Sequence, residues 1–265
     1  MHPILISIGK FSIRSYGAMA AVGFLLGCWL VNMNRKYAKM SADQASTSVF
    51  VAMISGIVGA RIFYVVQFFD SYRDNLWNVF RIDQGGLVFY GGFLLTLPML
   101  WIYCRWSKLD IIRVFDIYAP ALAIAHACGR IGCFLNGCCW GKPTDLFFGV
   151  TYPEGSSPAL CYPGQSLYPV QLIEAGEQIA LFFLYFWMVR HTRRGVTMSS
   201  YLILYGILRF LNELMRGDNA KVVESFTIAQ VIGFALIPGG IVLLIYFLRT
   251  GRKKQDEPED TELSN

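Results

Sequence analysis

The chain has 265 residues, of which 55% are hydrophobic and only 15% are charged, and its mean hydropathy is +0.45. A soluble domain carries about 25% charged residues, so this composition disfavours a soluble enzyme, a disordered protein and a small disulfide-stabilised secreted module. The net charge of +5 comes from short basic clusters between apolar segments, which argues against a nucleic-acid-binding face.

The apolar segments are long enough to cross a bilayer, which takes roughly 20 residues in a helix. In chain order, seven segments qualify: 16–33, 47–69, 86–104, 114–135, 171–189, 199–215 and 226–248. We therefore predict an all-α integral membrane protein with seven transmembrane helices, forming one transmembrane domain over residues 1–250. Residues 137–170 are expected to form a structured external loop, and residues 251–265 a disordered, charged cytoplasmic tail.

The distribution of Lys and Arg predicts the orientation, because cytoplasmic loops of membrane proteins are enriched in these residues. The loops after the first, third and fifth segments, together with the C-terminal end, contain thirteen of the 23 basic residues, whereas the longer segments on the other side contain seven. The N-terminus and the 137–170 loop are therefore expected outside, and the C-terminus in the cytoplasm.

The remaining three basic residues, Arg61, Arg130 and Arg209, lie within expected spans. A charge in the bilayer interior costs several kcal/mol, so intramembrane arginines usually mark a working site. Arg130 is expected about 9 Å below Asn136, the external end of its helix, at a rise of about 1.5 Å per residue. We expect all three guanidinium groups to converge toward the external leaflet.

Polar neighbours of these arginines recur at helical spacing. In the sixth segment, one helix face is predicted to carry Tyr205, Arg209, Asn212, Glu213 and Arg216. The simplest alternative is that Arg209 and Glu213 only neutralise each other as an i,i+4 pair.

In the fourth segment, His126, Arg130 and Cys133 share a face, and Tyr16 and Tyr90 enter their helices from the external end. Neither Arg61 nor Arg130 has an acidic neighbour at helical spacing, so pairing within one helix does not explain them. We therefore predict a polar pocket, built from five helices and open to the outer leaflet.

The planar guanidinium group matches phosphate oxygens and stays charged at any relevant pH. A pocket with two or three arginines facing phospholipid is therefore expected to hold an anionic lipid headgroup. A transporter of small anions would use the same chemistry. However, the odd number of spans and the lack of a recognisable inverted repeat argue against a transporter.

The segment Gly129–Gly141 resembles the signature of the phosphatidylglycerol–prolipoprotein diacylglyceryl transferases, a family of bacterial membrane enzymes. Further elements similar to those of the family follow the same order between Ile13 and Leu248: Tyr16-Gly17, Gly59-Ala60-Arg61, Gly85–Gly92, Tyr168–Glu174, and Tyr205–Arg209 followed by Glu213 and Arg216.

This resemblance implies a reaction and a location. Members transfer the diacylglyceryl group of phosphatidylglycerol to the lipobox cysteine of a prolipoprotein signal peptide, forming a thioether and releasing glycerol phosphate. It also implies the bacterial cytoplasmic (inner) membrane, an active site toward the external or periplasmic side, and no cofactor.

The resemblance also assigns residues. Arg130 would bind the lipid phosphate and stabilise the leaving group, and Arg209 would be a second cation beside it. Glu213 would orient Arg209 or accept the thiol proton, and Tyr90 stands where many members carry a histidine that is the favoured general base. The implied substrate-binding residues are Arg130, Tyr16, Arg61, Asn136, Gly141 and Tyr205. Cys133 and Cys138 also depart from the family, where many members have Asn and Glu.

Seven cysteines leave room for a membrane thiol oxidoreductase, although none of them form a Cys-x-x-Cys pair. A structural interpretation is simpler: one external disulfide from Cys161 to Cys138 or Cys139. No metal site is expected, because the three histidines, His2, His126 and His191, lie at different depths.

Overall fold

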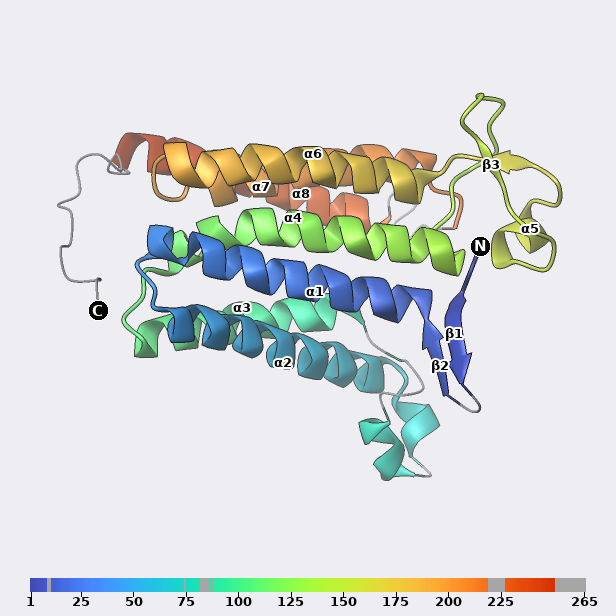
Figure 1. Cartoon of the computed structure of the whole chain (residues 1–265), viewed down its shortest axis with the longest axis horizontal. Helices are drawn as coiled ribbons and strands as arrows, with labels where there is room; N and C mark the ends of the chain where they lie inside the picture. Colours follow the sequence, from blue (N-terminus) through green and yellow to red (C-terminus); the bar gives the residue numbers. More distant parts are fainter. Residues whose placement is uncertain (9–10, 74, 82–85, 87, 219–226, 251–265) are drawn as a thin grey trace. The chain divides into compact units, whose positions relative to one another are not determined.

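The computed structural model describes residues 1–8, 11–73, 75–81, 86, 88–218 and 227–250 (Figure 1). It divides into two compact units. Unit 1 comprises Met1–Leu30 and the chain from Phe115 onward, and unit 2 comprises Val31–Val114. The predicted tail, residues 251–265, lies outside the described residues.

A long helix occupies each of the seven apolar segments. These helices are α1 (Ser15–Asn34), α2 (Ala42–Gln67), α3 (Phe89–Trp106), α4 (Ile111–Asn136), α6 (Val170–His191), α7 (Val196–Met215) and α8 (Ile228–Thr250). The prediction of an all-α membrane protein is thus confirmed at the level of its architecture.

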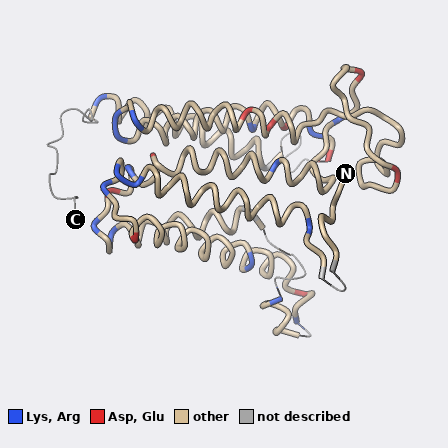
Figure 2. Tube along the Cα trace, in the orientation of Figure 1, with Lys and Arg blue, Asp and Glu red and all other residues tan. Residues whose placement is uncertain are grey.

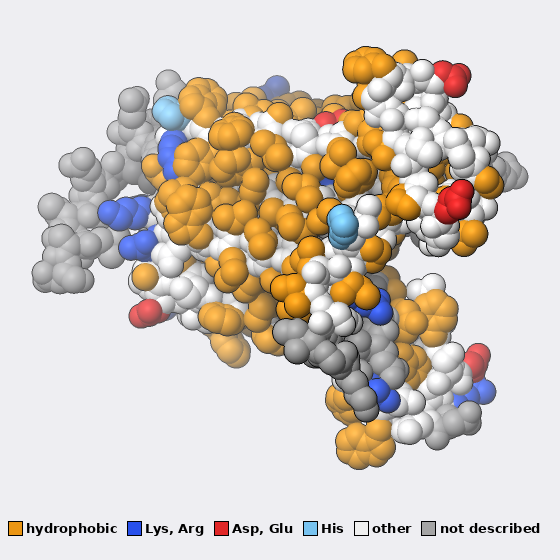
Figure 3. All heavy atoms as spheres, turned by 45° about the vertical axis from the view of Figure 1, so that its right-hand side comes forward, with side chains coloured by type: hydrophobic (Ala, Val, Ile, Leu, Met, Phe, Trp, Pro, Cys, Tyr) orange, Lys and Arg blue, Asp and Glu red, His pale blue; other side chains and the backbone are white. Residues whose placement is uncertain are grey.

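Within the described residues, five helices are both long and apolar enough to cross a membrane: α1, α2, α4, α6 and α8. Hydrophobic side chains cover most of the face shown in Figure 3, and Leu25, Val66 and Val242 are 65%, 71% and 67% exposed. Side chains of this kind favour contact with lipid. The protein is therefore an integral membrane protein, whereas the count of seven spans stays a prediction.

Side chains hydrogen-bonded to backbone amides stabilise the first turn of two of these helices. Ser41 and Gln44 form a reciprocal capping box at the start of α2, with N–O distances of 3.1 and 2.9 Å. Asp110 Oδ1 accepts the amide of Ile112 at the start of α4. Lys and Arg gather at helix ends, and charged residues are rare within the helices (Figure 2).

In unit 1, α7 packs against both α6 and α8, and α1 approaches α4 through small residues. A Cβ atom on Gly23 would lie 3.0 Å from Cys128 Cβ and 3.1 Å from the Ala125 carbonyl oxygen. The close contact between these helices therefore depends on the glycine, as is common in membrane helix packing.

In unit 2, α2 packs along α3. A Cβ on Gly59 would lie 2.7 Å from Leu95 Cβ, and one on Gly92 would lie 2.7 Å from the Gly56 carbonyl oxygen. Two helical backbones can approach this closely only where side chains are absent.

Short elements complete the fold. Strands β1 (Ile4–Ile8) and β2 (Phe11–Arg14) pair antiparallel before α1. The segment between α4 and α6 carries β3 (Val150–Thr151), α5 (Ser157–Cys161) and β4 (Ser166–Leu167), and β3 pairs with β4. The 3₁₀ helices are η1 (Arg35–Ala38), η2 (Phe69–Tyr72) and η3 (Leu76–Phe80).

Candidate active site

A buried carboxylate from α6 joins the two arginines of unit 1. Glu174 Oε2 lies 2.5 Å from Nε of Arg130 on α4, and Glu174 Oε1 lies 3.6 Å from Nη1 of Arg209 on α7. The side chains are 3%, 12% and 15% exposed, respectively. Three helices therefore place two guanidinium groups around one shared carboxylate.

Both arginines keep N–H donors that the described part of the chain does not use. Toward the described residues, Arg130 donates through Nε. Arg209 Nη2 lies 2.9 Å from Glu213 Oε2, whereas Arg209 Nη1 and Glu174 Oε1 are buried without a hydrogen-bond partner among the described residues. Leaving buried charged donors without hydrogen bonds is costly, so the arrangement suits an anionic ligand that accepts from them.

His126 lies one turn before Arg130 on α4 and takes part in the same cluster. Its Nε2 accepts a hydrogen bond from Arg130 Nε at 3.2 Å and lies 3.7 Å from Glu174 Oε2. Because Nε2 is an acceptor here, the ring is neutral, with its proton on Nδ1. Its centroid lies 5.8 Å from that of Tyr205, which stacks on Tyr201.

Residues on the predicted polar face of α7 contact two different carboxylates of α6. Arg209 and Glu213 face the cluster around Glu174, as described above. The neighbouring Asn212 donates to Glu177 Oε2 on α6 at 2.5 Å. The simple i,i+4 pairing of Arg209 with Glu213 is thus present, but a third charged group from another helix joins it.

Sequence reasoning missed Glu174 as a site residue, although it lies within a segment that resembles the family. A signal was available in α6, where Gln171, Glu174 and Gln178 interrupt an apolar helix at spacings of three and four residues. All three are buried, with exposures of 0%, 2% and 3%. Buried polar side chains on one face of a membrane helix indicate a partner on another helix.

The end of α4 shapes one side of the site. Gly137 has φ +76°, its amide donates to the Phe134 carbonyl at 3.2 Å, and the Cys138 amide donates to the Cys133 carbonyl at 3.1 Å. These bonds form a Schellman motif, which ends the helix and turns the chain back. Asn136, the last residue of α4, is half-buried.

Gly141 lies where the chain after α4 meets the end of α7. The Gly217 amide donates to the Trp140 carbonyl at 3.0 Å, and the Lys142 amide donates to the Met215 carbonyl at 2.8 Å. A Cβ on Gly141 would lie 2.6 Å from Tyr168 Cβ. The small size of Gly141 is therefore required by packing.

Tyr16 lies at the start of α1, beside α4. A Cβ built on Gly132 would be 3.3 Å from Tyr16 Cδ2, so the tyrosine ring lies against the turn of α4 that follows Arg130. This places Tyr16, one of the predicted substrate-binding residues, near the arginine cluster of unit 1.

The other two predicted site residues, Arg61 and Tyr90, belong to unit 2. The Arg61 guanidinium donates to the carbonyl groups of Val79, Gly86, Asn78 and Arg81 at 2.7–3.1 Å. These bonds attach α2 to the chain that precedes α3. Tyr90, near the start of α3, is 37% exposed.

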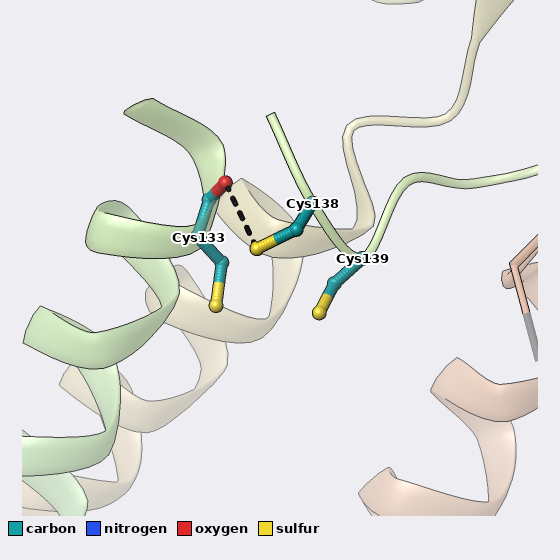
Figure 4. A group of neighbouring side chains, drawn as sticks. All are labelled: Cys133, Cys138 and Cys139. Carbon is teal, nitrogen blue, oxygen red and sulfur yellow. Dashed lines mark hydrogen bonds between the residues drawn. The ribbon is translucent and has the colours of Figure 1, made fainter. Parts of the chain in front are cut away.

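The cysteines differ from the prediction. Cys138, Cys139 and Cys161 are all free thiols, so the predicted disulfide from Cys161 is wrong. Instead, the sulfur atoms of Cys133, Cys138 and Cys139 lie within 4.8 Å of one another (Figure 4). Sequence spacing did not reveal this cluster, because the Schellman turn folds Cys138 and Cys139 back toward Cys133. Three thiols at this separation could hold a metal ion.

Comparisons with known proteins find relatives across nearly the whole chain. The model of the family described as prolipoprotein diacylglyceryl transferase matches residues 3–246. Phosphatidylglycerol–prolipoprotein diacylglyceryl transferases from Clostridium botulinum (strain Langeland) and Clostridium kluyveri are each 32% identical to this chain, covering 96% of it and 99% of their own length. The enzyme of that name from Pseudoalteromonas translucida is 33% identical, covering 96% of both chains. The chain therefore belongs to the prolipoprotein diacylglyceryl transferase family.

Proposed function

We propose that this protein transfers the diacylglyceryl group of phosphatidylglycerol to a prolipoprotein at the cluster formed by Arg130, Glu174, Arg209 and Glu213. Family membership and the names of the relatives support the reaction. The proposal for the site rests on one observation: two arginines from different helices meet at a buried carboxylate and keep N–H donors that the described residues leave unused.

The phosphate of the lipid would take these unused donors. The Nη groups of Arg130 and Nη1 of Arg209 supply the donors, while Glu174 and Glu213 hold the two guanidinium groups in place. Charge-assisted hydrogen bonds of this type are roughly twice as strong as neutral ones. Tyr16, Asn136, Gly141 and Tyr205 are proposed to line the headgroup and the glyceryl chain.

The chemistry requires a thiol of the prolipoprotein, which we propose is the lipobox cysteine of its signal peptide. The sulfur attacks the glyceryl carbon bonded to the phosphate, a C–S bond forms, and the C–O bond breaks with its electron pair going to glycerol phosphate. Negative charge grows on the phosphate oxygen as this bond breaks. Arg130 and Arg209 stabilise that charge through donors already in place.

The thiol proton needs an acceptor. Glu213 is one candidate, because its carboxylate lies beside Arg209. Tyr90 is the other, because the family resemblance described above places it where a histidine is the favoured general base. Arg61 is proposed to contribute indirectly, by holding the chain before α3, to which it donates.

We propose that all seven long helices span the bacterial cytoplasmic (inner) membrane, with the N-terminus outside and the site toward the external leaflet. Support comes from the distribution of Lys and Arg and from the position of Arg130 in the C-terminal third of α4. Residues 1–250 would form the catalytic domain, and residues 251–265 a cytoplasmic tail.

The test is a transfer assay with purified protein, phosphatidylglycerol and a lipobox peptide, followed by mass spectrometry of the peptide. We expect the wild type to add one diacylglyceryl group to the cysteine. Arg130→Gln should reduce the rate by about 100-fold or more, because loss of one preorganised donor to a transition-state charge has that effect. Arg105→Gln, an exposed arginine at the end of α3, is the matched control and should keep the wild-type rate.

Two results would contradict the proposal. An Arg130→Gln variant that inserts into membranes and transfers at the wild-type rate would exclude Arg130 from the site. A wild-type protein that binds phosphatidylglycerol but leaves the peptide mass unchanged would exclude the reaction.

A further inference from the structure

We propose that Cys133, Cys138 and Cys139 form a binding site for a thiophilic divalent metal ion, with Zn²⁺ as the expected occupant. The three sulfur atoms lie within 4.8 Å of one another (Figure 4). Cys133 comes from α4, and the other two come from the turn that follows it. This site lies outside the reaction proposed above, which uses none of the three thiols.

The spacing fits the coordination chemistry of zinc. Zn–S bonds of about 2.3 Å in a tetrahedral arrangement place sulfur atoms about 3.8 Å apart. The observed upper limit of 4.8 Å requires the sulfurs to close by about 1 Å, which rotation of the side chains can supply. Three thiolates are also the soft ligands that favour Zn²⁺ over Mg²⁺ or Ca²⁺.

The backbone of the turn holds the thiols in position. The Schellman bond between the Cys138 amide and the Cys133 carbonyl brings these two residues together, and Gln171 Nε2 donates to the Cys138 carbonyl at 2.8 Å. Cys139 has φ +63°, a left-handed conformation that is unfavourable for a residue with a side chain. Strained backbone of this kind tends to occur at functional positions.

Zn²⁺ binds cysteine as the thiolate, so each thiol that binds the ion releases its proton. Three thiolates with one Zn²⁺ carry a net charge of −1. Without a metal, the Cys138 thiol donates weakly to the Cys133 carbonyl at 3.7 Å.

A metal ion accounts for the three cysteines better than a disulfide does. A disulfide would use two of the thiols and leave the third unpaired, and all three are free. A tetrahedral ion uses all three and leaves its fourth position for water or another exchangeable ligand.

The experiment is a metal titration of the full-length protein, purified in detergent with a reductant and stripped with a chelator. Co²⁺ serves as the optical probe, because thiolate ligands give an intense charge-transfer band and tetrahedral geometry gives strong visible bands. We expect one Co²⁺ per chain, displaced by one Zn²⁺. Cys133→Ser, Cys138→Ser and Cys139→Ser should each weaken binding by at least about 100-fold, the upper range for loss of supporting contacts around a metal site.

Cys161→Ser is the matched control, since Cys161 is an exposed thiol outside the cluster, and it should bind like the wild type. Absence of the thiolate band in the reduced wild type would overturn the proposal. So would a band that persists when any of the three cluster cysteines is replaced, or that disappears with Cys161. A disulfide among the three, detected as the loss of two hydrogens from a protein kept in reductant, would overturn it as well.

Two control measurements separate loss of the metal site from misfolding and from loss of the transferase activity. The thermal unfolding of each serine variant without metal should match that of the wild type without metal, which shows that lost binding does not reflect misfolding. The titration contains neither lipid nor peptide, and the transfer assay needs no added metal. Failure of the metal site and failure of the proposed transferase activity are therefore distinguishable.

Discussion

At the scale of single residues, the site depends on Glu174, whose carboxylate contacts Arg130 on one helix and Arg209 on another. Arg130 and Arg209 stand out in the sequence because charge within an apolar segment is costly. Glu213 could be predicted as a partner of Arg209, because it lies four residues later on the same helix. Glu174 comes from another helix, and no spacing within one helix can indicate a contact that depends on how three helices pack.

Glu174 provides a sharp test at this scale. Glu174→Gln keeps the shape of the side chain but removes the charge shared by Arg130 and Arg209. Breaking a buried ion pair by removing one partner costs about 3–5 kcal/mol, and the guanidinium groups would no longer be held in place. We expect a lower midpoint of thermal unfolding and a transfer rate reduced by about tenfold or more.

Glu177→Gln is the matched control, because Glu177 lies one turn away on α6 and pairs with Asn212 through a hydrogen bond that an amide can partly keep. It should lose little stability and little activity. Equal effects of the two substitutions on both measurements would show that the bridge between the arginines has no special role.

At the scale of elements, the length of the apolar segments predicted the helices. The turns between them depend on backbone dihedral angles that the sequence pattern does not give. Gly137 permits the sharp exit from α4 through its φ of +76°. Gly141, by contrast, is absent from the positive-φ positions of the described chain. It is needed because Tyr168 lies against it.

The packing at Gly141 predicts a loss of stability for Gly141→Ala. The added Cβ would lie 2.6 Å from Tyr168 Cβ and 2.9 Å from Val170 Cγ2, so the start of α6 must shift. Overpacking of this kind costs about 1–3 kcal/mol. Thermal unfolding in detergent should show the loss.

Gly176→Ala gives the opposite expectation and serves as the control. A Cβ at this exposed position of α6 meets nothing within 4 Å, and alanine favours a helix over glycine by about 0.5–1 kcal/mol. The variant should unfold at or above the wild-type temperature. If Gly141→Ala were as stable as Gly176→Ala, the packing argument would be wrong.

At the scale of the whole molecule, hydropathy located the helices, because a bilayer demands long apolar segments whatever their neighbours. It could not locate the β1–β2 hairpin or the small β3–β4 sheet, since strands of two to five residues leave little periodicity to detect.

The predicted orientation can be tested with the protein's own thiols. Cys161 on α5 is exposed, and the segment between α4 and α6 is expected outside. A membrane-impermeant maleimide added to intact cells should therefore label Cys161 in the wild type, as read from the mass of the peptide that contains it, and Cys161→Ser should lose that labelled peptide. Labelling that requires broken cells would place this segment in the cytoplasm and reverse the orientation.

Asp116 on α4 has a consequence for how the two arginines meet. Its carboxylate accepts the amides of Gly195 and Met198 at 2.6 and 2.9 Å, at the N-terminal end of α7. Fourteen residues separate Asp116 from Arg130, and fourteen separate Gly195 from Arg209, a rise of about 21 Å in each helix. The two guanidinium groups consequently reach the same height. A single residue inserted in either interval would swing its arginine by about 100° around the helix axis, so the length of these intervals defines the site as much as its side chains do.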